Sequence, residues 1–347
     1  NDGNSIEMNV ASDGTNSGII RGIQNARFSN CRFIQNQDNE TINFELQKAE
    51  FENCTFQKNE AKTILRLDNP RSSNDDNLQE IKLNNVQFSE NNGTSLDAPK
   101  YTKVIVSDSD FVGNNGSAIK AEYQVAVTNS IFQDLKDSAI HVEGDGQPSY
   151  VEARNSSFIN NHSSKNGGAI FCKTINVANI VFRENYAKEA GGAIYLEPVS
   201  LSFDDFEEHE RPVDHIHNCI FDSNIAGFEG GGVNSFGNSI RHFNLTPIGR
   251  SYAYLVNISN SIFFGNEAER GGAFSGFGTL INCTLVQNSA YASASVFAPV
   301  TEHPRIAYTT LTNCILWDNR NYEKVSDFLD ENHFVDETNK IIFATIK

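Results

Sequence analysis

Acidic side chains gather in one segment of this chain, between residues 197 and 214. Carboxylates this close together could hold Ca²⁺, which takes roughly six to eight oxygen ligands, or could act as a general acid and base. A solvated loop is the more common reason for such a run, so we assign no catalytic residue, no metal ligand and no cofactor, with Ca²⁺ left open. The candidate acidic site consists of Asp204, Asp205, Glu207, Glu208, Glu210 and Asp214.

Two histidines follow this segment at a spacing that is able to bind a metal. His215 and His217 flank Ile216, so both point outward from one strand face if Ile216 points inward. Neither a cysteine nor a third histidine stands nearby. We therefore expect exposed surface here rather than a metal site.

A short phrase that recurs eleven times must position these residues. Each copy has an apolar residue, a spacer, Asn, a small residue, a spacer and then a Phe or Leu anchor, with a second Asn three places later. The closest anchors are 21 to 24 residues apart, which is typical of a solenoid whose coils carry loops. The anchors are Phe33, Phe56, Phe88, Phe111, Phe132, Phe158, Phe182, Phe221, Phe263, Leu285 and Leu316.

Asparagine fills two columns of this repeat. Asn tolerates left-handed backbone angles and suits sharp bends, and Asn side chains stacked on neighbouring strands can hydrogen-bond in a ladder. We expect both columns to form corners whose side chains face inward. The column before the anchor has Asp108 in one copy and otherwise consists of Asn30, Asn53, Asn85, Asn129, Asn155, Asn179, Asn218, Asn260, Asn282 and Asn313. The column after the anchor has Leu135 in one copy and otherwise consists of Asn36, Asn59, Asn91, Asn114, Asn161, Asn185, Asn224, Asn266, Asn288 and Asn319.

The repeat predicts an all-β fold, a right-handed parallel β-helix of about eleven coils with three short strands per coil. A third strand follows small residues in most copies, as in Gly191-Gly192-Ala193-Ile194. We expect one domain over residues 1–347, with coils at about 20–320 and with 321–347 as an irregular cap or the start of a further coil. The longest insertions, at about 66–80, 197–214, 235–254 and 297–308, all precede the next apolar strand and should project along one edge.

Composition excludes several function classes. The net charge of −17 disfavours nucleic acid and anionic membrane surfaces as partners. No apolar stretch is long enough to span a bilayer, and the chain starts without a leader, so we expect either a processed protein or a fragment. Without an obvious cap, the ends of the coil would favour stacking of copies end to end.

Five of the six cysteines occupy the small position two residues before the anchor. We expect them to be buried thiols selected for their small volume. Cys31 with Cys54 and Cys283 with Cys314 occupy successive coils, so a disulfide within either pair is possible but is not predicted. The five are Cys31, Cys54, Cys219, Cys283 and Cys314.

Nine Asn-x-Ser/Thr triplets raise the question of N-glycosylation. Those at Asn53, Asn155, Asn161 and Asn282 lie in the two columns, and we interpret them as accidental because their side chains should face inward. The other five lie outside the columns and could carry glycans in a secreted eukaryotic protein. These are Asn39, Asn92, Asn115, Asn244 and Asn257.

The alternation of Phe-x-x-Asn with Gly-Gly-Ala-Ile resembles the repeats of chlamydial polymorphic outer-membrane proteins and related pectin-lyase-like β-helix surface proteins. The likeness is strongest between residues 155 and 290, in Phe158 to Asn161, Gly167 to Ile170 and Phe182 to Asn185. It implies a secreted or surface-displayed adhesive or structural protein, although the chain shows no C-terminal membrane barrel of that family.

Two classes of function remain. We rank first an extracellular structural or adhesive protein, a fragment or a stacking protomer of a surface fibre, with other copies or surface glycans as partners. The alternative is a polysaccharide lyase or glycoside hydrolase acting on an extracellular carbohydrate, since pectin-cleaving enzymes share the expected fold. Fold does not carry activity, and the Gly-His-Gly and Arg-Ile-Lys signatures of the hydrolases do not occur here.

Overall fold

The computed structural model of the chain contains β-strands that pair in parallel, and no helix occurs among the residues that it describes. Two compact units are present, residues 1–163 with 169–172, and residues 164–168 with 173–347. The described residues are 5–7, 25–37, 40–45, 48–68, 79–144, 149–197, 214–235, 256–276, 278–292, 296–298 and 310–321.

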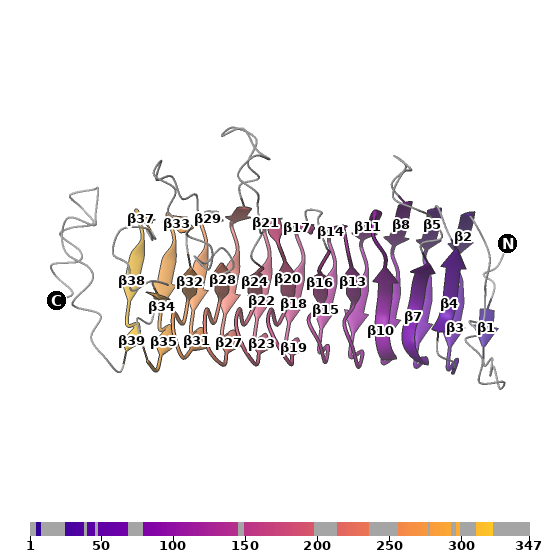
Figure 1. The fold of residues 1–347 in the computed structure, drawn as a ribbon, viewed down its shortest axis with the longest axis horizontal. Coiled ribbons are helices and arrows are strands. Elements are labelled where there is room, and N and C mark those ends of the chain that lie inside the picture. Colours follow the sequence, from indigo (N-terminus) through magenta and orange to yellow (C-terminus); the bar gives the residue numbers. More distant parts are fainter. Residues whose placement is uncertain are drawn as a thin grey trace, which may run out of the picture. The chain divides into compact units, whose positions relative to one another are not determined.

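The first unit has three parallel sheets, which we call leading, anchor and trailing in the order in which the chain visits them (Figure 1). The leading sheet contains β2 (Asn25–Ser29), β5 (Lys48–Glu52), β8 (Gln79–Asn84), β11 (Thr102–Ser107), β14 (Gln124–Thr128) and β17 (Tyr150–Arg154). The anchor sheet contains β1 (Ser5–Glu7), β3 (Arg32–Ile34), β6 (Thr55–Gln57), β9 (Gln87–Ser89), β12 (Asp110–Val112), β15 (Ile131–Gln133) and β18 (Ser157–Ile159). The trailing sheet contains β4 (Glu40–Glu45), β7 (Glu60–Asp68), β10 (Asn92–Ala98), β13 (Ile119–Ala121), β16 (Ile140–Val142) and β20 (Ile170–Cys172); the two-residue β19 (His162–Ser163) completes the unit.

The second unit repeats these three sheets and adds a fourth, short sheet. Its leading sheet contains β21 (Thr174–Ala178), β25 (Asp214–His217), β29 (Val256–Ser259), β33 (Gly278–Ile281) and β37 (Thr310–Thr312). Its anchor sheet contains β22 (Val181–Arg183), β26 (Ile220–Asp222), β30 (Ile262–Phe264), β34 (Thr284–Val286) and β38 (Ile315–Trp317). Its trailing sheet contains β24 (Ile194–Leu196), β28 (Val233–Ser235), β32 (Phe274–Gly276) and β36 (Phe297–Ala298). The short sheet contains β23 (Tyr186–Ala187), β27 (Ile225–Ala226), β31 (Glu267–Ala268), β35 (Ser289–Ala290) and β39 (Arg320–Asn321).

Both units are therefore right-handed parallel β-helices, and the predicted fold class is confirmed. The number of coils and the assignment of the whole chain to one domain stay predictions. Two features were not foreseen, the short sheet of the second unit and β1, whose Ile6 pairs with the anchor Phe33. The phrase around Ile6 lacks the first Asn, since Gly3 stands there, which explains why the repeat did not reveal this strand.

Two left-handed residues per turn bracket each anchor strand and limit it to three residues. The first is the column before the anchor, where every residue has a φ close to +50°, such as +53° at Asn53. The second lies two places after the anchor, such as Lys58 with a φ of +52°. Asn at the first position has the expected role, because its short polar side chain tolerates this conformation.

The column after the anchor forms a buried ladder of amides. Asn91 is typical, because its Oδ1 accepts from Nδ2 of Asn59 at 2.9 Å and from the backbone N of Asn59 at 3.0 Å. Its own Nδ2 donates to Asn114 Oδ1 and to the carbonyl of Phe56, each at 2.9 Å. Both the side-chain amide and the backbone N–H at the corner thus have hydrogen-bond partners, as buried polar groups require. The ladder and the inward direction are confirmed for this column.

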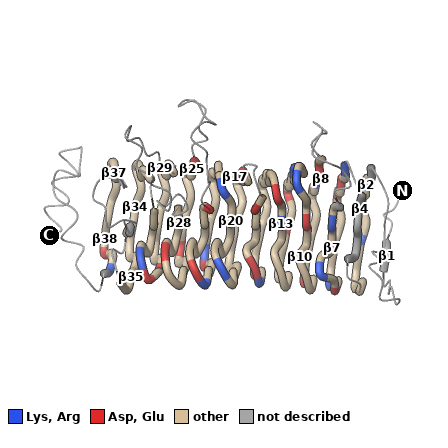
Figure 2. The backbone as a smooth tube through the Cα atoms, in the orientation of Figure 1, with Lys and Arg blue, Asp and Glu red and all other residues tan. Residues whose placement is uncertain are grey.

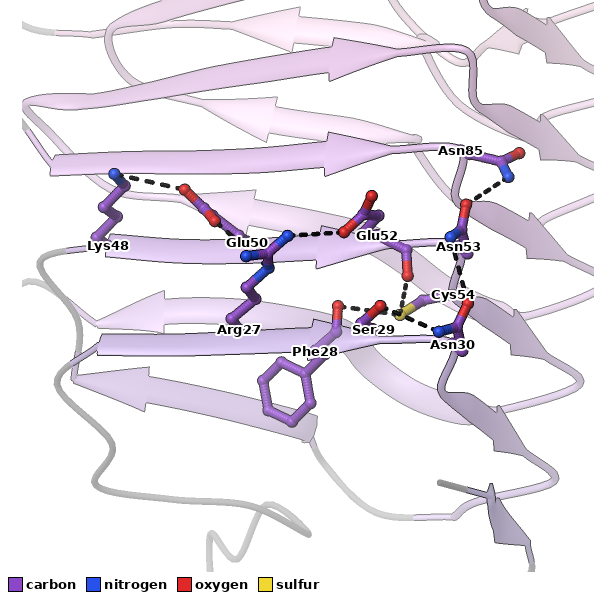
Figure 3. A network of polar contacts seen from close by, with 10 residues as sticks. All are labelled: Arg27, Phe28, Ser29, Asn30, Lys48, Glu50, Glu52, Asn53, Cys54 and Asn85. Atoms are coloured by element: carbon purple, nitrogen blue, oxygen red, sulfur yellow. Dashed lines mark hydrogen bonds and ion pairs between the residues drawn. The ribbon is translucent and has the colours of Figure 1, made fainter. Parts of the chain in front are cut away.

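The column before the anchor also forms a ladder, but the prediction that it faces inward is wrong. Asn53 Nδ2 donates to Asn30 Oδ1 at 3.2 Å, and Asn85 Nδ2 donates to Asn53 Oδ1 at 2.7 Å (Figure 3). All of these side chains are exposed. The left-handed angle at the Asn interrupts the alternation of an extended strand. Around Asn53, for example, Glu52 is half-buried, Asn53 is exposed and Cys54 is buried, so the Asn points out and the small residue after it points in. The residues to which this correction applies are Asn30, Asn53, Asn85, Asn129, Asn155, Asn179, Asn218, Asn260, Asn282 and Asn313.

The small residue after this exposed Asn is buried, and its side chain hydrogen-bonds to the backbone of the turn. Ser109 Oγ donates to the carbonyl of Ser107 at 2.7 Å and accepts from the backbone N of Val86 at 3.0 Å. Cys54 places its Sγ 3.3 Å from the carbonyl of Glu52 in the same position (Figure 3). The predicted burial of the five cysteines is confirmed, and all six cysteines are free thiols in this structure.

Stacked phenylalanines fill the core beneath the anchor sheet. In the first unit the rings of Phe56 and Phe88 lie 4.4 Å apart between centroids with planes only 3° from parallel. In the second unit Phe221 and Phe263 repeat this at 4.5 Å and 6°. Each ring is fully buried, and the anchors from Phe33 to Leu285 are core residues, whereas the last anchor, Leu316, is half-buried.

Paired glycines allow the turns of the second unit to approach closely. Gly191 has a φ of +69°, which favours glycine, and a Cβ on Gly192 would lie 2.2 Å from the carbonyl oxygen of Gly231. The strand β24 that follows then brings Ile194 into register with Val233 of β28. The Gly-Gly pair is thus required by the close approach of neighbouring turns.

Candidate functional surface

The candidate acidic site lies almost wholly outside the described residues. This holds for Asp204, Asp205, Glu207, Glu208 and Glu210. Asp214 is described as the first residue of β25, and it is buried rather than part of an exposed cluster. The convergence of the six carboxylates therefore stays a prediction.

Asp214 occupies a position that is otherwise aliphatic in neighbouring turns of the leading sheet. Its partner in β29 is Val256, and Ile175 of β21 donates its backbone N to the Asp214 carboxylate at 2.6 Å. Burial raises the pKa of Asp214 to about 7, and the hydrogen bond from Ile175 offsets only part of this effect. The carboxyl group is thus a pH-sensitive element at the start of β25.

The two histidines of β25 are exposed, as expected. His217 Nδ1 lies 3.0 Å from Ser259 Oγ of the next strand. Across the described ranges no three His, Cys, Asp or Glu side chains come together in a way that could hold a metal ion. Apolar helices of membrane-spanning length are likewise not found in this part of the chain.

The sequon asparagines divide into buried and exposed residues differently from the expectation. Asn161 is buried in the inner ladder as predicted, whereas Asn53, Asn155 and Asn282 are exposed, so the argument that a sugar there would break a buried ladder is wrong for these three. Among the five sequons outside the columns, Asn92 and Asn115 are exposed and Asn257 is half-buried. Asn39 and Asn244 lie outside the described residues.

A group of partly buried polar residues lies on the trailing sheet of the second unit. Tyr195 is in register with Asn234 of β28, and Glu229 lies 3.8 Å from Arg270. Burial raises the pKa of Tyr195, with further contributions from nearby carboxylates that include Glu197, and burial also raises the pKa of Glu229. Raised pKa values of this kind are typical of acid-base sites, although structural ion-pair networks produce them as well.

The outer face of the anchor sheet differs between the two units. Its strands present their first and third residues outward, and in the first unit these are mostly polar, for example Gln87 paired with Asp110. Lysine, arginine, aspartate and glutamate residues recur along the first unit (Figure 2). Some form ion pairs, such as Lys82 with Glu80 at 2.8 Å on the leading sheet. Nothing on this face of the first unit forms an apolar surface of several neighbouring strands.

In the second unit the same outer face is apolar over much of β30, β34 and β38, whereas Arg183 of β22 and Asp222 of β26 form an ion pair at 2.9 Å on it and Thr284 of β34 is also polar. The third residues of successive strands are Phe264, Val286 and Trp317, which pair in register across β30, β34 and β38. Trp317 is 58% exposed and Phe264 is 43% exposed. We call this surface the apolar strip, and its exposed members are Ile220, Ile262, Phe264, Ile315 and Trp317.

Comparison with known proteins supports the resemblance of the repeats. The family described as the Chlamydia polymorphic membrane protein repeat matches residues 155–173 and 179–197. These two matches contain the paired glycines that begin the trailing strands and the anchors Phe158 and Phe182. No curated protein matches the sequence of the chain. Two stretches of the chain are thus similar to this repeat, and both lie on a parallel β-helix.

Proposed function

We propose that the chain is a surface-displayed β-helix with a structural and adhesive role. The observation that carries the proposal is the apolar strip, because exposed apolar side chains on several neighbouring strands mark interaction sites. The match to polymorphic membrane protein repeats supports display at a cell surface. The amide columns serve the scaffold, since their side chains bond to one another along the turns.

Attachment of coated beads tests this proposal. Beads that carry the folded chain should adhere to cells or to extracellular matrix several times more often than beads that carry the same chain after irreversible heat unfolding. Equal attachment of the two preparations would contradict an adhesive role. Release of reducing sugars or unsaturated products from polysaccharide by the folded chain would instead favour the enzyme alternative.

End-to-end association of copies is the structural part of the proposal. Within the described residues β37, β38 and β39 are each the last strand of their sheet and pair on one side only. Open strand edges favour pairing with another chain. Light scattering should then show a mass that rises with protein concentration, and a constant monomer mass up to high concentration would contradict the fibre.

A further inference from the structure

The apolar strip is long and narrow. It runs across β26, β30, β34 and β38, and left-handed residues such as Asn260 and Gln287 end the flat region on either side of each strand. Only two side chains of each strand therefore face outward. A ligand that covers this surface must be thin and must lie across the strands.

These dimensions disfavour a folded protein partner. A stable protein interface takes roughly 20–30 residues from each side, many more than the five exposed apolar residues of the strip. An added β-strand is also disfavoured, because it would need unpaired backbone groups, and the backbone of β34 is paired with both β30 and β38. A ligand on this surface can therefore contact side chains but cannot pair with the strand backbone.

Two aromatic rings in the strip have a regular spacing. Phe264 and Trp317 occupy the same position two strands apart, with Val286 between them. Because hydrogen-bonded strands are about 4.8 Å apart, the two aromatic residues are separated by roughly 10 Å along the strip. Successive sugars of an extended, equatorially linked hexopyranose chain repeat at almost the strand spacing, and every second sugar presents the same face. The two rings are therefore placed to stack on alternate sugars.

Polar groups border the strip on both sides. On one side lies the exposed ladder, in which Asn282 Nδ2 donates to Asn260 Oδ1 at 3.2 Å. On the other side Gln287 Nε2 donates to Asp318 Oδ2 at 3.1 Å, and Arg320 lies 3.8 Å from the same carboxylate. Amides and carboxylates can exchange hydrogen bonds with sugar hydroxyls. An apolar centre with polar borders matches a pyranose ring, whose faces carry C–H groups and whose rim carries hydroxyls.

We propose that the apolar strip binds an extended, β-1,4-linked hexopyranose chain that lies across β26 to β38, with Phe264 and Trp317 as stacking platforms. The proposal deepens the adhesive function proposed above and rests on it. It assigns the recognition of sugar to the second unit.

Calorimetric titration of the full chain with cellohexaose and with chitohexaose tests the proposal, and curved, α-linked maltohexaose is the comparison ligand. At least one of the two extended hexasaccharides should bind, at least about tenfold more tightly than maltohexaose. The double variant Phe264→Ala with Trp317→Ala should lose at least about tenfold in affinity, because both stacking platforms are removed. Trp317→Tyr should retain most of the binding, since it keeps a ring.

A matched control is available in the first unit. Ile131 is an exposed residue on the outer face of that anchor sheet, and Ile131→Ala should leave the affinity unchanged. Failure of both extended hexasaccharides to bind, or equal affinity of the wild-type chain and the double variant, would overturn the proposal. A double variant that dissociates a dimer would also overturn it, since the strip would then be an interface between copies.

The bead assay separates this proposal from the adhesive function. If the double variant loses the hexasaccharide and the beads lose attachment, both stand. If attachment persists in a chain that never binds the sugars, only the sugar proposal fails. If the sugars bind as described but wild-type beads do not attach to any surface, the adhesive function fails and the strip stands as a sugar site.

Discussion

Asn59 and Asn91 lie 32 residues apart in the sequence, yet the Oδ1 of Asn91 accepts two hydrogen bonds from Asn59, one from its side chain at 2.9 Å and one from its backbone at 3.0 Å. The same pair of bonds recurs between Asn266 and Asn288 in the second unit, at 2.9 and 3.0 Å. In these turns an amide therefore ties one turn to the next and serves the corner and the ladder together.

Replacement within the buried ladder should be costly. Asn91→Asp leaves a carboxylate facing the carbonyl of Phe56 and the amide oxygen of Asn114, neither of which it can serve as a donor. We expect a loss of roughly 3 kcal/mol or more in the free energy of unfolding. Urea unfolding followed by circular dichroism gives the value.

The matched control is Asn53→Asp in the exposed ladder. Asp108 already occupies this column with a φ of +50°, so Asp is compatible with the turn. The cost should stay below roughly 1 kcal/mol. Equal losses in Asn91→Asp and Asn53→Asp would contradict the division into an inner and an outer column.

Much of this division could not be read from the sequence. The recurrence of Asn at two offsets from Phe56 and its equivalents was sufficient to predict turns, ladders and parallel strands. It did not reveal which ladder is buried, because both columns share the same residue type and the left-handed angle at Asn53 interrupts the expected alternation. Asp108 in the first column was an available signal, since a charged residue is tolerated at an exposed corner. The apolar strip depends on the register of turns separated by insertions of different length, which puts Phe264 and Trp317 in one file.

Glycine replacement should show the steric limit of the turns. Gly192→Ala places a Cβ 2.2 Å from the carbonyl oxygen of Gly231, and backbone atoms must shift to accept it. We expect a loss of roughly 2–4 kcal/mol. Gly265→Ala is the control in the same unit, since Gly265 is also left-handed but its Cβ would meet nothing nearer than Ser223 Oγ at 3.4 Å.

The loss for Gly265→Ala should be only about 1 kcal/mol, which is the conformational penalty alone. Thermal unfolding of both variants provides the comparison. A larger loss for Gly265→Ala than for Gly192→Ala would show that close approach of the turns is not what selects glycine.

Stability should depend on pH through Asp214. Its pKa is about 7 in the folded chain, against an ordinary value of 3.8, so the folded state holds a proton that the unfolded state releases. The resulting destabilisation is full above pH 7 and is relieved as the pH falls toward 4. Asp214→Asn should therefore stabilise the chain at pH 8, by up to about 4 kcal/mol, and should make no difference near pH 4.

The difference between the wild-type chain and Asp214→Asn isolates this group from other titrations. Urea midpoints measured between pH 4 and pH 8 supply it. A constant difference across this window, or a variant that is less stable at pH 8, would contradict the buried, protonated carboxyl.

Cys54 and Cys219 should resist modification in the folded chain. Burial raises the pKa of Cys54 to about 11 and that of Cys219 to about 12, so few thiolates form at pH 8. We expect Ellman's reagent to label Cys54 and Cys219 at least about a hundredfold more slowly than in the unfolded chain, where all six thiols should react. Rapid labelling of either residue under native conditions would show that its thiol is not buried.

Stacking of the turns in register can be measured by a designed cross-link. Gln87 and Asp110 are 23 residues apart but are paired across β9 and β12 with both side chains outward. Since neighbouring strands are about 4.8 Å apart, Gln87→Cys with Asp110→Cys should form a disulfide on mild oxidation, detected by mass after proteolysis. The shifted pair Gln87→Cys with Val112→Cys should stay reduced. Cross-linking of the shifted pair alone, or of neither pair, would contradict the register on which the amide ladders and the apolar strip depend.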